Sequence, residues 1–296
     1  MKSFCRMGLI FILTISAVPA GYPAKIAMLV PTDLFLMGED PVNIPEDKVF
    51  LLETMSTAQA GLYWLVRHWE NDLGHVVNIY NSDQDDPVDV QDTNDLIFIT
   101  EALGSGSVAA DYRTSVKPVI FAEAYIMDDM GLTNGQSAFT GDSAATEIQI
   151  VNPNHPITKG LPDTFTATIL DKTTGKPILP TFSTVTDTSV LGGVGEILAV
   201  LPTSIDISNS GSQNSENVPV VIAVEKGTTL DQGDETLARW VFLGYSDDIE
   251  ATFADYGGDP NTKTLAVLSE PAIKLLDNCT AWALGMTTRV DSWPVH

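Results

Sequence analysis

Four short apolar runs in the first part of the chain constrain its fold more than any other feature. They are Lys25–Val30, His75–Tyr80, Leu96–Thr100 and Lys117–Glu123. Continuous apolar runs, as opposed to alternating ones, are typical of parallel strands buried on both faces. Parallel strands need long crossover connections, which are usually helical. The sequence therefore predicts an α/β fold with a parallel sheet and helices on both of its faces.

The longest helical pattern lies between the first two predicted strands. From Leu51 onward, apolar residues recur at spacings of three and four, which place them on one face of a helix. The members of this stripe are Met55, Ala58, Leu62, Leu65, Trp69 and Leu73. Gly74 follows at the position where a helix C-cap belongs. A shorter helix is predicted to open at the Gly/Ser turn 104–107 and to run through Tyr112.

Beyond Tyr125 the pattern changes to strands separated by turn-rich segments. The predicted strands are Thr146–Val151, Phe165–Leu170, Glu196–Leu201, Val218–Glu225 and Leu237–Tyr245. The Ser-, Asn- and Gly-rich stretch 209–217 is predicted to be a mobile surface loop. A final helix is expected to be capped near Ser269 and to end at Gly285. Its inward-facing residues are Ala272, Leu276, Cys279 and Ala283.

The N-terminus has the pattern of a signal peptide. Lys2 and Arg6 precede an apolar run over residues 8–18, which is shorter than the roughly 20 residues needed to span a bilayer. Small residues at Val18 and Ala20 predict cleavage after Ala20. We therefore expect residues 1–20 to be a signal peptide and the mature protein to be exported, to the periplasm or the cell exterior, without membrane insertion after cleavage.

The expected mature chain is a single α/β domain over residues 21–286. It carries a β-rich insertion at about residues 140–215, and residues 287–296 form a C-terminal tail. One cysteine, Cys279, remains after cleavage, so no internal disulfide is expected and packing must provide the stability.

The net charge narrows the range of partners. The chain has 39 acidic and 15 basic residues, which gives a formal charge of −24. Nucleic acids and anionic membrane surfaces would repel such a chain, so neither is an expected partner. A small-molecule ligand remains, while the oligomeric state is left open. The acidity is also compatible with a saline habitat.

Several segments together resemble a known superfamily. They are NDLIFITEALGSGSV at 94–108, KPVIFAEAYIMDDMGLT at 117–133, VNPNHPITKGL at 151–161, VPVVIAVEKGTTL at 218–230, ARWVFLGYSDD at 238–248 and LLDNCTAWALG at 275–285. In this order they resemble the class I glutamine amidotransferase-like superfamily, and within it the ThuA-like group of exported bacterial proteins. The resemblance implies a flavodoxin-like fold, and it supports binding of a small polar ligand such as a carbohydrate.

The resemblance also predicts which chemistry is missing. Active members of the superfamily carry a nucleophilic Cys at the turn that follows a central strand, with a His late in the chain. The matching turn, residues 121–125, reads Phe-Ala-Glu-Ala-Tyr and has no Cys. Cys279 falls on the inward stripe of the last helix, and only His296 follows His155. We therefore do not expect thiol-based amidotransferase activity.

The candidate site lies at the carboxyl ends of the parallel strands, where ligands bind in open α/β sheets. The expected residues there are Thr32, Asp33, Thr100, Glu101, Glu123, Tyr125 and Asp247. Because neighbouring strands are about 4.8 Å apart, Glu101 and Glu123 could approach closely. Two close carboxylates shift each other's pKa, which suits acid/base catalysis or cation binding. The alternative is that they accept hydrogen bonds from loop amides or cap the following helix.

Other polar residues have simpler interpretations. His155 is in a conspicuous loop and is kept as a candidate ligand-binding residue, although a turn with a side-chain–backbone hydrogen bond is the favoured interpretation. His68 is expected on the surface of the first helix. The Asp-rich segment 83–95 lacks the Gly and Glu of an EF-hand, so a solvated loop is favoured over a calcium site. No Cys/His cluster, P-loop or GxGxxG motif is present, so neither a metal nor a cofactor is expected.

Three functions remain open. The first is an exported protein of the amidotransferase-like fold that binds a small polar ligand, such as a carbohydrate, without thiol chemistry. The second is a hydrolase or isomerase that uses Glu101 and Glu123 as an acid/base pair. The third is a catalytically inert envelope or extracellular protein that interacts through an apolar patch on residues 140–215.

Overall fold

The computed structural model describes residues 23–31, 57–108, 110–134, 140–170, 175, 180–185, 188–206, 213–246 and 268–286. The predicted signal peptide, the C-terminal tail and three candidate residues lie outside these ranges. Those three residues are Thr32, Asp33 and Asp247.

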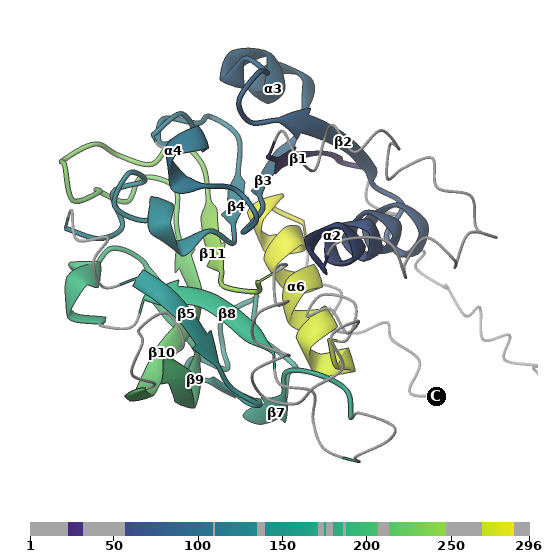
Figure 1. Cartoon of the computed structure of the whole chain (residues 1–296). Helices are drawn as coiled ribbons and strands as arrows, with labels where there is room; N and C mark the ends of the chain where they lie inside the picture. The colour runs from purple at the N-terminus through teal and green to yellow at the C-terminus, as the bar shows by residue number, and fades with distance from the viewer. Residues whose placement is uncertain are drawn as a thin grey trace, which may run out of the picture.

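Five parallel strands form one half of a large mixed sheet (Figure 1). They are β1 (Lys25–Val30), β2 (Val76–Asn81), β3 (Leu96–Ile99), β4 (Val119–Phe121) and β11 (Trp240–Leu243). Their order is β2-β1-β3-β4-β11, and every neighbouring pair is parallel. The predicted α/β fold with a parallel sheet is therefore confirmed.

Antiparallel strands extend the same sheet beyond β11. They are β10 (Gln213–Val224), β9 (Glu196–Asp206), β5 (Thr140–Ala144) and β8 (Thr181–Val185). In addition, β6 (Glu147–Ile150) pairs with β9, and β7 (Thr164–Thr166) pairs with β6. The loop prediction for residues 209–217 is wrong from Gln213 onward, because Gln213–Glu216 pair with β9. Backbone pairing there holds polar residues in a strand that composition alone assigns to a loop.

The helices lie on both faces of the parallel half (Figure 1). On one face are α2 (Thr57–Arg67), its π-helical continuation η3 (His68–Asp72) and α6 (Glu270–Ala283). On the other are α3 (Pro87–Thr93), α4 (Ser105–Val108) and the short 3₁₀ helix η4 (Ala124–Ile126). A further 3₁₀ turn, η6, spans Thr188–Leu191. Within the described ranges, no helix is both long and apolar enough to cross a membrane.

Alternation along the strands divides the core into two clusters. Ile26, Met28, Leu96 and Phe98 face α2 and α6, whereas Ala27, Leu29, Ile97 and Ile99 face α3 and α4. Both sets are buried, which explains why the strands read as continuous apolar runs.

Two helix ends follow the sequence prediction, whereas α4 ends at Val108 and does not run through Tyr112. Gly74 follows η3 with a φ of +73°, a left-handed conformation that glycine adopts without strain. At the start of α6, the Ser269 hydroxyl accepts a hydrogen bond from the Ala272 amide. The predicted cap at Ser269 is therefore confirmed.

Candidate functional site

Glu101 and Glu123 occupy corresponding positions at the carboxyl edge of the sheet. The β3–β4 register pairs Ile97 with Val119 and Ile99 with Phe121. Each glutamate therefore lies two residues beyond the last residue of this register, Glu101 after β3 and Glu123 after β4. The sequence prediction placed both at this edge for the same reason, because parallel strands end together.

The polar residues around Glu101 join the ends of three strands. The buried Thr100 hydroxyl donates to the Leu29 carbonyl of β1 at 2.8 Å. The Ser246 hydroxyl, just beyond β11, donates to Glu101 Oε2 at 2.8 Å. Ser246 was not among the predicted site residues, although it immediately precedes Asp247 in the sequence. The hydroxyl fixes the orientation of the Glu101 carboxylate at the sheet edge.

Glu123 is more buried than Glu101. Only 4% of it is exposed, and its Oε1 accepts a hydrogen bond from the Tyr125 amide at 2.6 Å. This interaction caps η4, so the helix-cap interpretation accounts for one carboxylate oxygen. Tyr125 is 38% exposed, so it presents an aromatic surface beside a buried carboxylate.

The antiparallel half of the sheet contributes polar groups to the same edge. Ser183 in β8 accepts a hydrogen bond from the Ala124 amide through its hydroxyl at 3.2 Å. The Ser246 amide donates to the Thr181 carbonyl at 3.4 Å, and Phe182 forms an isolated bridge with Tyr245. β8 therefore lies against the residues that follow β4 and β11. The sequence analysis missed β8, so it could not find these contacts.

His155 lies elsewhere. Its Nδ1 accepts a hydrogen bond from the Ile157 amide at 3.2 Å, which is the turn arrangement that the sequence offered as an explanation. Its ring lies 5.3 Å from that of Trp282. The Trp282 carbonyl accepts a hydrogen bond from Arg239, the residue just before β11. His155 is thus associated with the amino end of β11, whereas the two glutamates lie at the carboxyl edge.

The sequence prediction that His68 lies on the surface is wrong. Only 5% of the residue is exposed. Nδ1 is 2.9 Å from Asp72 Oδ2, and Nε2 is 2.7 Å from Asp277 Oδ1 in α6. The ring also stacks on the Trp64 indole, with centroids 5.1 Å apart and planes inclined by 5°. The physical reason for the error is Asp277, which is 209 positions away in sequence and covers the histidine from another helix.

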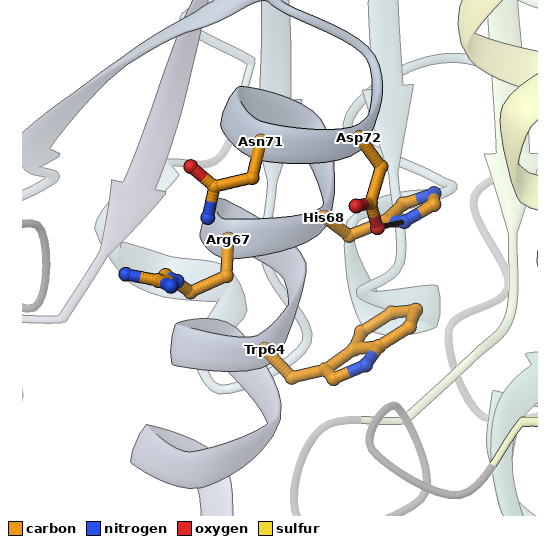
Figure 2. Close-up of a pocket in the computed structure, with 5 residues that line it drawn as sticks. All are labelled: Trp64, Arg67, His68, Asn71 and Asp72. Atoms are coloured by element: carbon orange, nitrogen blue, oxygen red, sulfur yellow. Dashed lines mark hydrogen bonds and ion pairs between the residues drawn. The ribbon is translucent and has the colours of Figure 1, made fainter. Parts of the chain in front are cut away.

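An open pocket of about 450 Å³ lies on α2 and η3, beside the stacked rings of Trp64 and His68 (Figure 2). Its lining residues are Trp64, Arg67, His68, Asn71 and Asp72. In Figure 2, Trp64, His68 and Asp72 form one row along the helix, and Arg67 and Asn71 lie beside that row. The pocket therefore offers an aromatic surface, a guanidinium, an amide and a carboxylate together.

The two aspartates change the protonation of His68. Burial lowers the pKa of His68, but the hydrogen bonds and charges of Asp277 and Asp72 outweigh burial and raise it above its ordinary value. For His155, burial dominates and lowers the pKa. The two histidines should therefore affect stability with opposite pH dependence.

We expect His68→Gln to cost more stability near pH 6 than near pH 9. A raised folded-state pKa gives stabilisation that is full below the unfolded value of about 6.5 and is lost as pH rises through the folded pKa. Thermal unfolding of wild type and variant between pH 6 and 9 measures this difference. His155→Gln is the matched control, and its cost should grow with rising pH. A pH-independent cost of His68→Gln would contradict the prediction.

The Asp-rich segment uses its carboxylates within the fold. Asp85 accepts a hydrogen bond from the Asn81 amide, Asp86 caps α3 at Val88, and Asp95 accepts one from the Lys25 amide. The sequence favoured a solvated loop here, but α3 (Pro87–Thr93) forms within the segment. Among the described residues, no group of three or more His, Cys, Asp or Glu side chains is placed to hold a metal ion.

Cys279 is fully buried on α6, where the helical stripe predicted it. Burial, with a smaller contribution from Asp277, raises the pKa of this thiol far above its ordinary value. The thiol is consequently protonated and has no thiolate character at neutral pH.

Two of the solved structures to which the chain is similar show how far the likeness goes. No protein-family model matches the chain, and no curated protein matches it. A ThuA-like protein from Bacteroides uniformis shares 14% identity at a TM-score of 0.44, over 88% of this chain and 95% of that one. A β-galactosidase from Bacillus circulans sp. alkalophilus shares 10% identity at a TM-score of 0.34, over 80% of this chain but 32% of its own. The chain is therefore similar to a ThuA-like protein at low identity.

Proposed function

We propose that the protein is exported and binds a small polar ligand of the carbohydrate class at the carboxyl edge of its parallel sheet. In this proposal the parallel half is flavodoxin-like, and cleavage after Ala20 releases the mature chain. The signal-peptide pattern, the ThuA-like sequence motifs and the polar residues at the strand ends support it.

One observation carries the proposal. Glu101 and Glu123 follow adjacent parallel strands at corresponding positions, beside the half-exposed Tyr125. Ser246 orients one of these carboxylates and the Tyr125 amide orients the other. Oriented carboxylates next to an aromatic ring provide hydrogen-bond acceptors and an apolar surface, the combination that small-molecule sites use for specificity.

A thermal-shift screen against mono- and oligosaccharides tests the proposal. A ligand at a hundred times its Kd stabilises the native state by about 2.7 kcal/mol, which is a measurable rise in Tm. We expect Glu123→Gln to abolish the rise in Tm, because the negative charge that binds the ligand is gone. The fold should be kept, since the glutamine side-chain oxygen can still accept the hydrogen bond from the Tyr125 backbone N–H. Glu147→Gln, an exposed change in β6, is the control. A shift that persists in Glu123→Gln would contradict binding at this edge.

A second candidate is carboxylate-based hydrolysis or isomerisation of a carbohydrate. It is favoured by the corresponding positions of the two glutamates, since glycoside hydrolysis usually employs a pair of carboxyl groups that flank the bond to be cleaved. Glu101→Gln and Glu123→Gln should then each remove turnover while a bound sugar still stabilises at least one variant. Binding without turnover in the wild type would leave the ligand-binding proposal in place.

A further inference from the structure

We propose that the pocket on α2 and η3 is a second binding site, for a neutral polyhydroxylated ring such as a monosaccharide. In it the Trp64 indole is the stacking surface, and Arg67, Asn71 and Asp72 are the hydrogen-bonding groups. The pocket shares no residue with the carboxyl-edge site, so the two proposals stand or fall separately.

The backbone at this pocket is specialised. The α-helix α2 changes into the π-helical segment His68–Asp72, and three of the five pocket residues lie in that segment. π-helical turns are rare and occur frequently at functional sites. Residues four apart are neighbours on one face of a helix. Trp64, His68 and Asp72 have this spacing, and Figure 2 shows them in that arrangement.

His68 fixes the aromatic surface in place. Both ring nitrogens are hydrogen-bonded to carboxylates, Asp72 on the same helix and Asp277 on α6, so the imidazole cannot rotate. Its face covers one face of the Trp64 indole in a nearly parallel stack. A cationic imidazolium strengthens this stack. The indole is therefore held before a ligand arrives, which lowers the entropic cost of binding.

The charges in and around the pocket favour a neutral ligand. The pocket lining holds one side chain of each permanent charge, cationic Arg67 and anionic Asp72, so neither sign of charge dominates it. An anionic ligand would also meet a chain with a formal charge of −24.

The polar groups match hydroxyls. A guanidinium only donates hydrogen bonds, an ionised carboxylate only accepts them and an amide does both, whereas each sugar hydroxyl can do either. The pocket volume of about 450 Å³ lies within the range of small-molecule sites, about 300–1,000 Å³. A sugar ring in the pocket would have both the indole and these polar side chains in its lining.

Calorimetric titration of the full chain with glucose, galactose and maltose tests the inference. We expect at least one sugar to bind, and Trp64→Leu to weaken it about tenfold through loss of the aromatic surface. Trp64→Phe should restore most of the affinity. Asn71→Ala, an exposed change with little consequence for folding, should weaken binding about fivefold through loss of one hydrogen bond.

The other variants separate this site from its alternatives. Binding that survives Trp64→Leu and Asn71→Ala but is lost in Glu123→Gln belongs to the carboxyl edge and would overturn the inference. So would the absence of binding by all three sugars. Inorganic phosphate that binds wild type but not Arg67→Met, with the sugars inert, would instead identify an anion site and likewise overturn it.

Discussion

Trp69→Ala is expected to lower the free energy of unfolding by about 3–5 kcal/mol, the range for truncating a buried aromatic residue. Trp69 is fully buried between η3 and the parallel sheet. Its ring packs edge-on against that of Phe98, with the two ring centroids 5.0 Å apart. Typical stabilities are about 5–15 kcal/mol, so this one change removes a large part of the total. Urea unfolding followed by circular dichroism measures it.

Trp69→Phe is the informative control. The indole Nε1 of Trp69 is buried and has no hydrogen-bond partner among the described residues. Phenylalanine keeps an aromatic ring against Phe98 and removes that unsatisfied donor, so the loss should be about 1 kcal/mol. Equal losses for alanine and phenylalanine would show that the N–H, and not ring packing, determines the stability here.

Asp277→Ala is expected to destabilise the protein by about 3 kcal/mol, the lower end of the range for breaking a buried ion pair. Asp277 is 14% exposed, and its Oδ1 lies 2.7 Å from His68 Nε2. Without it, the buried imidazolium keeps only Asp72, which is 65% exposed. The measurement is urea unfolding at pH 6, where His68 is charged.

Asp277→Asn separates charge from shape. The asparagine can still accept a hydrogen bond from His68 but carries no charge, so its loss at pH 6 should be smaller than that of alanine. The free energy of unfolding of this variant should also change less between pH 6 and 9 than that of the wild type. The reason is that Asp277 makes the largest contribution to raising the pKa of His68. An unchanged pH dependence in Asp277→Asn would assign the effect to Asp72 instead.

The sequence predicted those parts of the fold that depend on local patterns. The bounds of β1 were predicted at Lys25–Val30 and are confirmed, because a buried parallel strand needs an unbroken apolar run. The helix after Ser269 is confirmed for a similar reason, since its cap and its stripe lie within one short segment. These features need no information from distant residues.

Strands with polar sequences could not be predicted in this way. β8 has the sequence TFSTV, and all five of its residues are buried, three of them with hydroxyls. Its burial comes from neighbours such as Tyr245 and Ala124, which are far away in sequence. A buried polar strand has the composition of a loop until its partners are known.

In the candidate sites, too, the sequence predicts what depends on local patterns and misses contacts between distant residues. The positions of Glu101 and Glu123 follow from the ends of two apolar strands, so sequence reasoning found both. The Ser246–Glu101 hydrogen bond spans 145 positions, and the His68–Asp277 pair spans 209. The spacing of Trp64, His68 and Asp72 was visible in the sequence, but only Asp277 turns that row into a rigid, buried arrangement.

The position of β11 has a consequence for how this chain could be divided. On one side β11 pairs in parallel with β4, and on the other it pairs antiparallel with β10. The strands that follow β4 therefore occupy the hydrogen-bonding edge that would otherwise end the parallel half. Excising β10 and the strands beyond it would leave the backbone N–H and C=O groups of a fully apolar strand, β11 (Trp240–Leu243), open to pairing with other molecules. The two halves of the sheet share β11, so removing either half exposes one edge of this apolar strand. We therefore expect fragments that contain only one half to aggregate.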